Sequence, residues 1–352
     1  MKPLDRELII DGVRIADDTD CYVIAEIGHN HQGNVEKCKA LFVAAQEAGA
    51  SAVKLQKRDN RSLFTREAFD RPYDHENSFG PTYGTHREAL ELGWDEYQEL
   101  KQYAKELGIT FFATAFDVAS VDFLAELDVP AIKIASGDLK SLYLLEYAAQ
   151  LRKPMVVSTG VATMSDVQRA YDTIMPVNPQ LCLLQCTAAY PPEWEQLDLR
   201  VISTFRQQFP DVVIGFSSHD NGIAMATVAY TLGARVVEKH FTLNRAMKGT
   251  DHAFSLEPVG LRKLVRDLRR ARVALGTGDK RIHPNEVPAG VKMGKKIVAR
   301  HDLAVGQVLE LKDVAMKSPG DGLSPDHLSE VLGRALLQPL RADDAIALDM
   351  LG

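Results

Sequence analysis

The strongest constraint on the fold of this chain is an eight-fold alternation of short apolar runs with amphipathic stretches. The apolar runs are typical of parallel strands that are buried on both faces. These runs cover residues 21–28, 51–56, 110–116, 131–136, 155–159, 181–187, 212–218 and 236–241. The stretches with helical spacing cover residues 35–48, 95–107, 118–127, 142–151, 165–175, 198–208, 222–232 and 259–275. Eight such units, with no glycine-rich dinucleotide turn, favour a closed (β/α)8 TIM barrel over a doubly wound open sheet.

Two segments depart from this rhythm. Residues 57–93 form a connection that is too long for a simple loop, and their tyrosines, phenylalanines and arginines favour an ordered cover over the site. After Gly276 the chain becomes rich in glycine, proline and lysine, and short apolar runs then resume. We therefore expect a barrel at 1–277, a linker at 278–295 and a small compact module at 296–352.

Composition excludes several classes of protein. The chain has 48 acidic and 41 basic residues, a net charge of −7, which argues against a general nucleic-acid binder but not against a small anionic substrate. No apolar run is long enough to span a bilayer, and the N-terminus lacks the apolar centre of a signal peptide. Because of this charge and these features we expect no nucleic-acid or membrane partner. The four cysteines form no CxxC pair, which predicts a reduced, cytoplasmic protein.

Active sites of such barrels lie at the carboxyl ends of the strands. The polar and aromatic residues at the ends of the apolar runs are therefore the candidate site residues. They are Glu26, Lys54, Gln56, Thr114, Phe116, Lys133, Ser136, Asp138, Ser158, Thr159, Gln185, Thr187, Tyr190, Ser217, His219, Glu238, His240 and Asp251.

Two lysines stand out because they interrupt apolar strands. Lys54 and Lys133 can both point into the barrel, and a buried ammonium needs an anionic partner. A bound phosphate or carboxylate would supply that charge, whereas pairing with Glu26 or Asp138 would make the lysines purely structural. A third interpretation is that Lys133 forms a Schiff base.

Histidines supply the second signal. His219 and His240 end the seventh and eighth runs, so their imidazoles can share a divalent metal, or each can be a satisfied structural residue. His29 and His31 lie in a turn, where we expect a hydrogen-bonding role. Lys239 alternates with His240 and should face the helices.

Cys182 and Cys186 lie on one face of the sixth run, where we expect them to pack in the core.

The strand-end residues sit in motifs that resemble those of the sialic acid synthases. The matching segments span nearly the whole chain, and the tail is similar to the family's antifreeze-like (SAF) domain, a small β-clip-type fold. The segments are IAEIGHNHQGN (24–34), VKLQK (53–57), RPYDHENSFGPTYGTHRE (71–88), IKIASGD (132–138), STG (158–160), QCTAAYP (185–191), GFSSHD (215–220) and EKHFTLNRAMKGTDHAFSLEP (238–258).

This resemblance implies a transferase that condenses phosphoenolpyruvate with N-acetylmannosamine or its 6-phosphate. The products are N-acetylneuraminate or its 9-phosphate, with inorganic phosphate released by C–O cleavage, and the cofactor is Mn²⁺ or Mg²⁺. The same chemistry on mannose 6-phosphate or a diacetamido hexose is one alternative. A Schiff-base pyruvate aldolase using Lys133 and a non-catalytic carbohydrate-binding protein are others.

The resemblance also implies a role for each matching residue. Phosphoenolpyruvate is expected to contact Lys54, Gln56, Thr114, Lys133, Ser136, Ser158 and Ser217. The metal ligands are expected to be His219 and His240, and the catalytic group to comprise Glu26, Lys54, Lys133 and Asp251. The sugar is expected to contact Phe116, Asp138, Tyr190, Glu286 and Lys292.

Three positions bear on the choice of sugar. Some bacterial members read the N-acetyl group with an arginine from the partner subunit and carry an asparagine in the sixth motif, where this chain has Ser318 and Ala188. Both differences weaken the case for plain N-acetylmannosamine. Lys292 is similar to animal-type synthases that accept phosphorylated sugars, although a solvated linker charge is an equal alternative.

The tail admits two interpretations. It is either a lid that completes the partner's active site in a domain-swapped homodimer, which we favour, or an independent binding module.

Overall fold

The computed structural model describes residues 6–352, which divide into two compact units after Gly276. The first unit holds one large hydrophobic core and the second unit a separate small one. No helix within residues 6–352 is long and apolar enough to cross a membrane.

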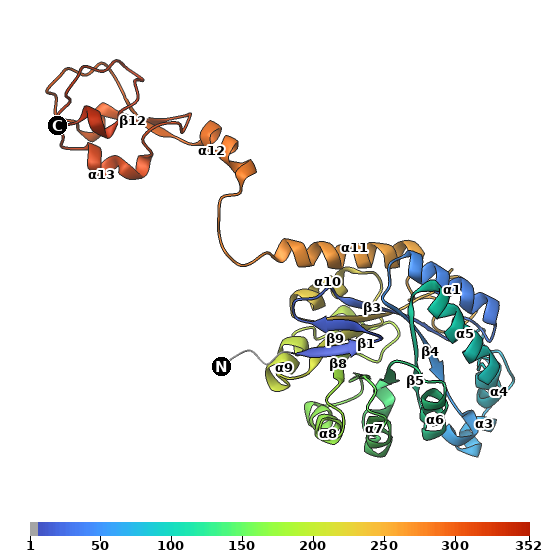
Figure 1. The fold of residues 1–352 in the computed structure, drawn as a ribbon. Helices are drawn as coiled ribbons and strands as arrows, with labels where there is room; N and C mark the ends of the chain where they lie inside the picture. The colour runs from blue at the N-terminus through green and yellow to red at the C-terminus, as the bar shows by residue number, and fades with distance from the viewer. Residues whose placement is uncertain (1–5) are drawn as a thin grey trace. The chain divides into compact units, whose positions relative to one another are not determined.

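The first unit is a closed barrel of eight parallel strands (Figure 1). The strands follow one another around the barrel in chain order, and β10 closes it against β3. They are β3 (Tyr22–Gly28), β4 (Ala52–Lys57), β5 (Thr110–Ala115), β6 (Ile132–Ile134), β7 (Met155–Ser158), β8 (Leu181–Cys186), β9 (Val213–Ser218) and β10 (Val236–His240). The predicted TIM barrel is therefore confirmed.

Helices surround the strands (Figure 1). Local signals set their ends: Asn34 caps the start of α1 (Val35–Glu47) by accepting from the Lys37 amide, and Gly108 ends α5 (Trp94–Leu107) in the left-handed conformation at φ 68°. The helices that alternate with the strands are α1 (Val35–Glu47), α5 (Trp94–Leu107), α6 (Val118–Glu126), α7 (Leu142–Ala149), α8 (Met164–Ile174), α9 (Val201–Gln208), α10 (Ala224–Thr231) and α11 (Pro258–Leu275).

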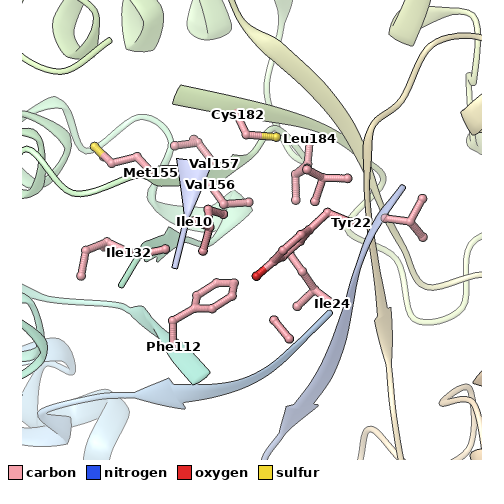
Figure 2. Packing of buried hydrophobic residues seen from close by; sticks show 14 of the residues in the cluster. Ile10, Tyr22, Ile24, Phe112, Ile132, Met155, Val156, Val157, Cys182 and Leu184 are labelled. Carbon is pink, nitrogen blue, oxygen red and sulfur yellow. The ribbon is translucent and has the colours of Figure 1, made fainter. Parts of the chain in front are cut away.

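The amino end of the barrel is closed by a hairpin that the apolar pattern did not predict. Strands β1 (Glu7–Ile10) and β2 (Val13–Ala16) pair antiparallel before the barrel begins. Leu8 and Ile10 are fully buried, and Figure 2 shows Ile10 among side chains of the barrel strands. Because the run is only four residues long and precedes the eight-fold rhythm, its place became visible only in the folded chain.

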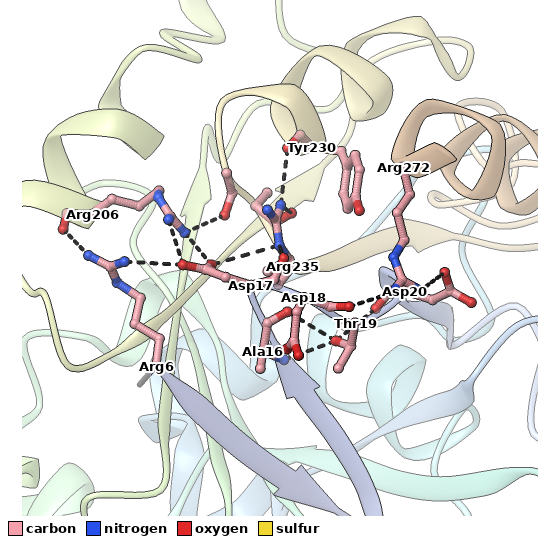
Figure 3. A network of polar contacts seen from close by, with 12 residues as sticks. Arg6, Ala16, Asp17, Asp18, Thr19, Asp20, Arg206, Tyr230, Arg235 and Arg272 are labelled. Carbon is pink, nitrogen blue, oxygen red and sulfur yellow. Dashed lines mark hydrogen bonds and ion pairs between the residues drawn. The ribbon is translucent and has the colours of Figure 1, made fainter. Parts of the chain in front are cut away.

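Charged residues hold the segment after this hairpin against the barrel (Figure 3). Asp17 accepts hydrogen bonds from both terminal nitrogens of Arg206, at 2.7 and 2.8 Å, and ion-pairs with Arg6 and Arg235. The hydrogen bonds from Arg206 lower the pKa of Asp17. Asp20 accepts from Arg272 of α11 at 2.7 Å, so this segment is tied to both α9 and α11.

The long connection 57–93 is ordered around three short helices, as expected for a cover. They are α2 (Asn60–Leu63), α3 (Arg66–Asp70) and α4 (Tyr83–Glu88). Thr82 and Thr85 form a capping box at the start of α4. His75, Asn77 and Arg87 of this segment line the cavity described below.

The second unit is built from short elements around a small core that includes Ile297, Leu309 and Ile346. Strands β11 (Lys296–Ala299) and β12 (Val314–Lys317) pair antiparallel. The expected linker contains a helix, α12 (Val287–Met293). The remaining elements are the 3-10 turns η3 (Pro284–Glu286), η4 (Leu311–Asp313), η5 (Pro325–His327) and η6 (Leu348–Met350), and the helix α13 (Leu328–Val331).

Candidate active site

A cavity of about 660 Å³ opens at the carboxyl ends of the barrel strands, a size typical of small-molecule sites. It brings together most of the residues predicted from the strand ends. Those that line it are Glu26, Lys54, Gln56, Thr114, Phe116, Lys133, Ser136, Ser158, Tyr190, Ser217, His219, Glu238, His240 and Asp251.

Strand register places the charged residues of the cavity side by side. Glu26 of β3 is paired with Lys54 of β4 on one side and with His240 of β10 on the other. Paired residues of parallel strands point to the same face, so all three side chains enter the barrel at one level. Lys54 Nζ lies 2.6 Å from Glu26 Oε2 and donates to Thr114 Oγ1 at 2.7 Å.

Lys133 of β6, two strands along the barrel from Lys54 of β4, lies in a matching environment. Its Nζ donates to Ser158 Oγ at 2.7 Å and to the Ile134 carbonyl at 2.8 Å. The nearest carboxylate is that of Glu238, at 3.9 Å, rather than that of Asp138. Burial lowers the pKa of Lys133, and the charge of Glu238 opposes that shift.

Glu238 lies between the two lysines, with its Oε2 3.8 Å from Lys54 Nζ. Its Oε1 accepts from Ser217 Oγ at 3.1 Å, while Oε2 has no hydrogen-bond donor among the described residues. The depth of the cavity thus holds two lysines and two carboxylates. The internal pairing of Lys54 with Glu26, one of the alternatives from the sequence, is present in this structure.

The two predicted metal ligands face each other. The ring centres of His219 and His240 are 5.3 Å apart. His219 Nδ1 lies 3.1 Å from the Thr187 carbonyl, which can only accept, so the proton is on Nδ1 and the lone pair is on Nε2. Burial lowers the pKa of His219 to about 3, which keeps it neutral at neutral pH.

These imidazoles fit a divalent metal. His240 Nδ1 is buried without a hydrogen-bond partner among residues 6–352 and lies 3.7 Å from Asp251 Oδ2. Imidazole nitrogen atoms without another hydrogen-bond partner are ordinary ligands of Mn²⁺-type ions. Within residues 6–352, no three histidine, cysteine, aspartate or glutamate side chains are placed to hold one metal ion together. Water or substrate would therefore supply the remaining ligands of a metal at this position.

Glycine at position 28 keeps this end of the cavity open. Gly28 ends β3 at φ 55°, and a Cβ there would lie 3.1 Å from Gln56 Nε2 and 3.3 Å from Glu26 Oε1. Gln56 in turn donates to Glu26 Oε1 at 2.7 Å, which orients that carboxylate.

The predicted sugar contacts divide between the two units. Phe116 and Tyr190 line the cavity, with the Tyr190 ring centred 4.0 Å from that of His219. Asp138 ends the turn η1 (Ser136–Asp138), where burial raises its pKa to about 6. Glu286 and Lys292 belong to the second unit, in η3 and α12, and both are exposed.

Strand-end reasoning missed two arginines of the cavity. Arg58 directly follows β4 and is 8% exposed, and Arg87 lies in α4. Both contact His29: Arg58 Nη1 is 3.0 Å from its Nε2, and Arg87 Nη1 is 3.2 Å from its Nδ1. Arg58 lies two residues beyond the predicted run 51–56 and would have been found by including those residues, whereas Arg87 depends on how α4 folds back.

The hydrogen-bonding role expected for the two turn histidines is confirmed, since His31 Nδ1 accepts from the Gly33 amide at 3.0 Å. Lys239 faces away from the cavity, as expected, and pairs with Asp220 at 3.0 Å. Cys186 is buried, as expected, but it also lines the cavity and lies outside the main core cluster. It shares a strand face with the core residue Cys182, but it stands at the carboxyl end, where that face borders the cavity.

Comparison with known proteins identifies the family. Residues 41–280 match the model of the NeuB family, and residues 296–352 match the SAF domain. The N-acetylneuraminate-9-phosphate synthase of Homo sapiens is 41% identical over 345 residues, which cover 98% of this chain and 96% of that protein. The N,N'-diacetyllegionaminic acid synthase of Legionella pneumophila is 35% identical, covering 92% of each chain.

A solved structure agrees with these sequence relatives. The crystal structure of N-acetylneuraminic acid synthetase from Leptospira borgpetersenii, in complex with citrate, superposes with a TM-score of 0.71 at 30% identity. It covers 82% of this chain and 96% of that chain. The family-model match, the near full-length identity and the strand-end constellation agree, and this chain belongs to the NeuB family, with a SAF domain at its carboxyl end.

Proposed function

We propose that this protein is a metal-dependent nonulosonic acid synthase, which condenses phosphoenolpyruvate with an N-acetylated hexosamine or its 6-phosphate. The observation that carries the proposal is the pair of buried lysines, Lys54 and Lys133, in the same cavity as the facing imidazoles of His219 and His240. Relatives named as sialic acid and legionaminic acid synthases support the same chemistry.

Phosphoenolpyruvate carries a phosphate and a carboxylate, and the depth of the cavity offers cations and hydroxyls for both. When phosphoenolpyruvate binds, the ammonium groups of Lys54 and Lys133 would exchange part of their contacts with Glu26 and Glu238 for contacts with its phosphate and carboxylate. The further contacts that we propose are Gln56, Thr114, Ser136, Ser158 and Ser217. Charged hydrogen bonds of this kind stabilise the negative charge throughout the reaction.

The acceptor sugar would lie toward Phe116, Tyr190 and Asp138, with His219 and His240 between it and phosphoenolpyruvate. A divalent cation, Mn²⁺ or Mg²⁺, held by these imidazoles would act as a Lewis acid on the acceptor's aldehyde. Asp251, whose Oδ2 lies 3.7 Å from His240 Nδ1, would contact water bound to that cation or the sugar itself. Glu286 and Lys292 stay predictions as further sugar contacts.

The bond changes follow from the two substrates. C3 of phosphoenolpyruvate forms a bond to the aldehyde carbon, whose oxygen takes a proton, and C2 becomes an oxocarbenium centre. Water adds to C2 and gives up a proton, for which Glu26 is the candidate acceptor because its carboxylate lies in the depth of the cavity, 2.6 Å from Lys54 Nζ. The bond between C2 and the phosphate oxygen then breaks, and the hydroxyl on C2 gives its proton to the departing inorganic phosphate, which leaves C2 as a ketone.

The assembly is also a proposal. We infer a domain-swapped homodimer in which the SAF domain of one subunit covers the site of the other, and a cytoplasmic location, where the four thiols stay reduced. The division into a barrel at 1–277, a linker at 278–295 and a SAF domain at 296–352 goes with this inference.

The direct test is release of phosphate from phosphoenolpyruvate with Mn²⁺. The acceptors to compare are N-acetylmannosamine, mannose, the 6-phosphate of each, and a diacetamido hexose. We expect release with an N-acetylated acceptor and loss of release in excess EDTA, restored by added Mn²⁺. Phosphoenolpyruvate labelled with ¹⁸O at the bridging oxygen should place the label in phosphate, and label retained in the sugar acid would contradict C–O cleavage.

One alternative keeps a specific observation in its favour. Lys133 is buried and its pKa is lowered, as in lysines that form Schiff bases with pyruvate. Its contacts with Ser158, Ile134 and Glu238 instead suit a retained ammonium. Borohydride with pyruvate should therefore leave the mass of the protein unchanged, and a pyruvate adduct on Lys133 would favour the aldolase.

A further inference from the structure

The cavity wall beside His29 carries more positive charge than the described residues neutralise. Arg58 and Arg87 both line the cavity, and no carboxylate oxygen within residues 6–352 lies within 4.0 Å of a guanidinium nitrogen of either. The nearby carboxylate of Glu91 is already paired with Lys57, at 3.2 Å. A buried guanidinium without an ion-pair partner is costly, so this arrangement needs a reason.

The hydrogen bonds around His29 also indicate that the two arginines lack an acceptor. Guanidinium nitrogens can only donate, and one approaches each ring nitrogen of His29. Burial, and then the charges of Arg58 and Arg87, lower the pKa of His29 well below its usual value, so the ring is neutral. A neutral imidazole accepts at one nitrogen only, and one of the two arginines therefore faces an N–H group instead of an acceptor.

Arg58 is held rigidly in spite of this. Its guanidinium carbon lies 3.6 Å from the ring centre of Phe116, and its Nη2 donates to Gln56 Oε1 at 2.8 Å. Stacking and a fixed fork of donors are the features with which arginine recognises phosphate and carboxylate groups. Phe116 and Gln56 both line the cavity, so the group that meets this fork is a bound substrate.

We propose that Arg58, assisted by Arg87, binds an anionic group of the acceptor sugar, a phosphate ester, and thereby selects phosphorylated hexosamines over plain ones. This inference rests on the proposed synthase function. Lys54, Lys133 and the serines around them are the contacts proposed for both anionic groups of phosphoenolpyruvate, so the arginines remain for the other substrate. The sequence suggested a different residue, the exposed Lys292, for the same task.

The test compares the ratio of kcat/KM for N-acetylmannosamine 6-phosphate to that for N-acetylmannosamine. The wild type should prefer the phosphorylated sugar. In Arg58→Gln the ratio should fall by about ten-fold or more through a higher KM for the phosphorylated sugar, because only that transition state loses the contact. Any loss that Arg58→Gln causes through its contacts with Gln56 and Phe116 should lower kcat/KM for both sugars alike, so it cancels in the ratio.

Two further variants keep the result interpretable. Arg61→Gln is the matched control, since Arg61 also stacks at 3.6 Å on a phenylalanine, Phe69, but lies outside the cavity lining. It should leave the ratio unchanged. Arg58→Lys keeps the charge and loses the fork, so it should recover part of the ratio.

Three outcomes would overturn the proposal: a wild type that prefers the plain sugar, an unchanged ratio in Arg58→Gln, or an equal loss with both sugars. A raised KM for phosphoenolpyruvate alone would assign the arginines to that substrate and overturn it as well. Calorimetric binding of N-acetylmannosamine 6-phosphate to the wild type and to Arg58→Gln needs no turnover. A wild type that binds the sugar phosphate through Arg58 but never releases phosphate would refute the synthase function and not the anion site.

Discussion

At the scale of single residues, the cavity depends on how burial sets charge. Lys54 and Lys133 remain near carboxylates, His219 is kept neutral, and Asp138 has its pKa raised to about 6. Desolvation is the largest cause of the pKa shifts of Lys133, His219 and Asp138, and neighbouring charges modify those shifts. Such perturbed groups in and beside one cavity are typical of an active site.

Asp138 offers a pH-dependent test of this burial. Because its pKa is raised from 3.8 to about 6, the folded protein binds this proton more tightly than the unfolded chain. The free energy of unfolding of the wild type should therefore lose this contribution as pH rises from about 4 to about 6.

Asp138→Asn removes the titration. The free energy of unfolding of the variant should rise relative to that of the wild type between about pH 4 and pH 6 and keep this difference above pH 6. Because Asp138 is only partly buried, we expect a difference of about 1–2 kcal/mol. Urea unfolding at several pH values measures the difference. A difference that does not change with pH would show that Asp138 has an ordinary pKa.

At the scale of elements, the barrel positions its site through strand ends and pins its other end with the hairpin β1–β2. The two ends are built by different rules, because residues at the amino end contribute to stability and those at the carboxyl end to chemistry. The hairpin and β10 show this division.

Ile10 and Ile9 are adjacent in β1, and they form a matched pair. Ile10 is fully buried among barrel side chains, whereas Ile9 is 44% exposed. Ile10→Ala should lower the free energy of unfolding by about 2–4 kcal/mol through the cavity it leaves, and Ile9→Ala by about 0.5 kcal/mol or less. Urea denaturation gives both values, and similar losses for the two would mean that the hairpin does not close the barrel as described.

β10 carries Lys239 on the face behind the cavity and His240 on the face that lines it. Lys239 Nζ, buried behind the cavity, donates to the Asp220 side chain at 3.0 Å and to its carbonyl at 2.6 Å, which fixes the turn that carries His219. Asp220→Asn leaves a buried ammonium without its partner, so it should cost about 3–5 kcal/mol.

The double variant Asp220→Asn with Lys239→Met should recover part of that loss, since no unpaired charge remains. Mn²⁺ binding, followed by electron paramagnetic resonance of the free ion, should weaken in both variants because the turn of His219 is released. Full recovery of stability together with unchanged Mn²⁺ binding would reduce this pair to a packing role.

At the scale of the whole molecule, two units with separate cores share one chain. The first has the large core of a complete barrel, so it should fold by itself, whereas the second has the thin core of a small module. The proposed homodimer gives the second unit its purpose as a cover for the site of the partner.

Truncation after Gly276 tests both statements. Residues 1–276 should unfold in one cooperative transition and retain Mn²⁺ binding, because the barrel core and both imidazoles are present. We expect light scattering to give a dimer for the full chain and a monomer for the truncated one. Phosphate release should fall by about ten-fold or more, since the site loses its cover. A truncated protein that remains dimeric and fully active would contradict the domain-swapped arrangement.

The sequence by itself determined the barrel, because its signals are local. Each buried parallel strand must be a short apolar run and each covering helix must have a polar face, so the strands lie within one or two residues of their expected bounds. The same runs identified most of the cavity, since residues that end parallel strands must meet at one end of a barrel.

Only the tertiary structure decided which of these residues meet. The register of β3 against β4 and β10 pairs Glu26 with Lys54 and sets both beside His240. Folding of α4 brings Arg87 to the ring that Arg58 contacts, and the hairpin places Ile10 in a core formed by residues far along the chain. These contacts join segments that are distant in sequence, and closing the barrel fixes their register, whereas a periodic pattern carries information only about neighbours.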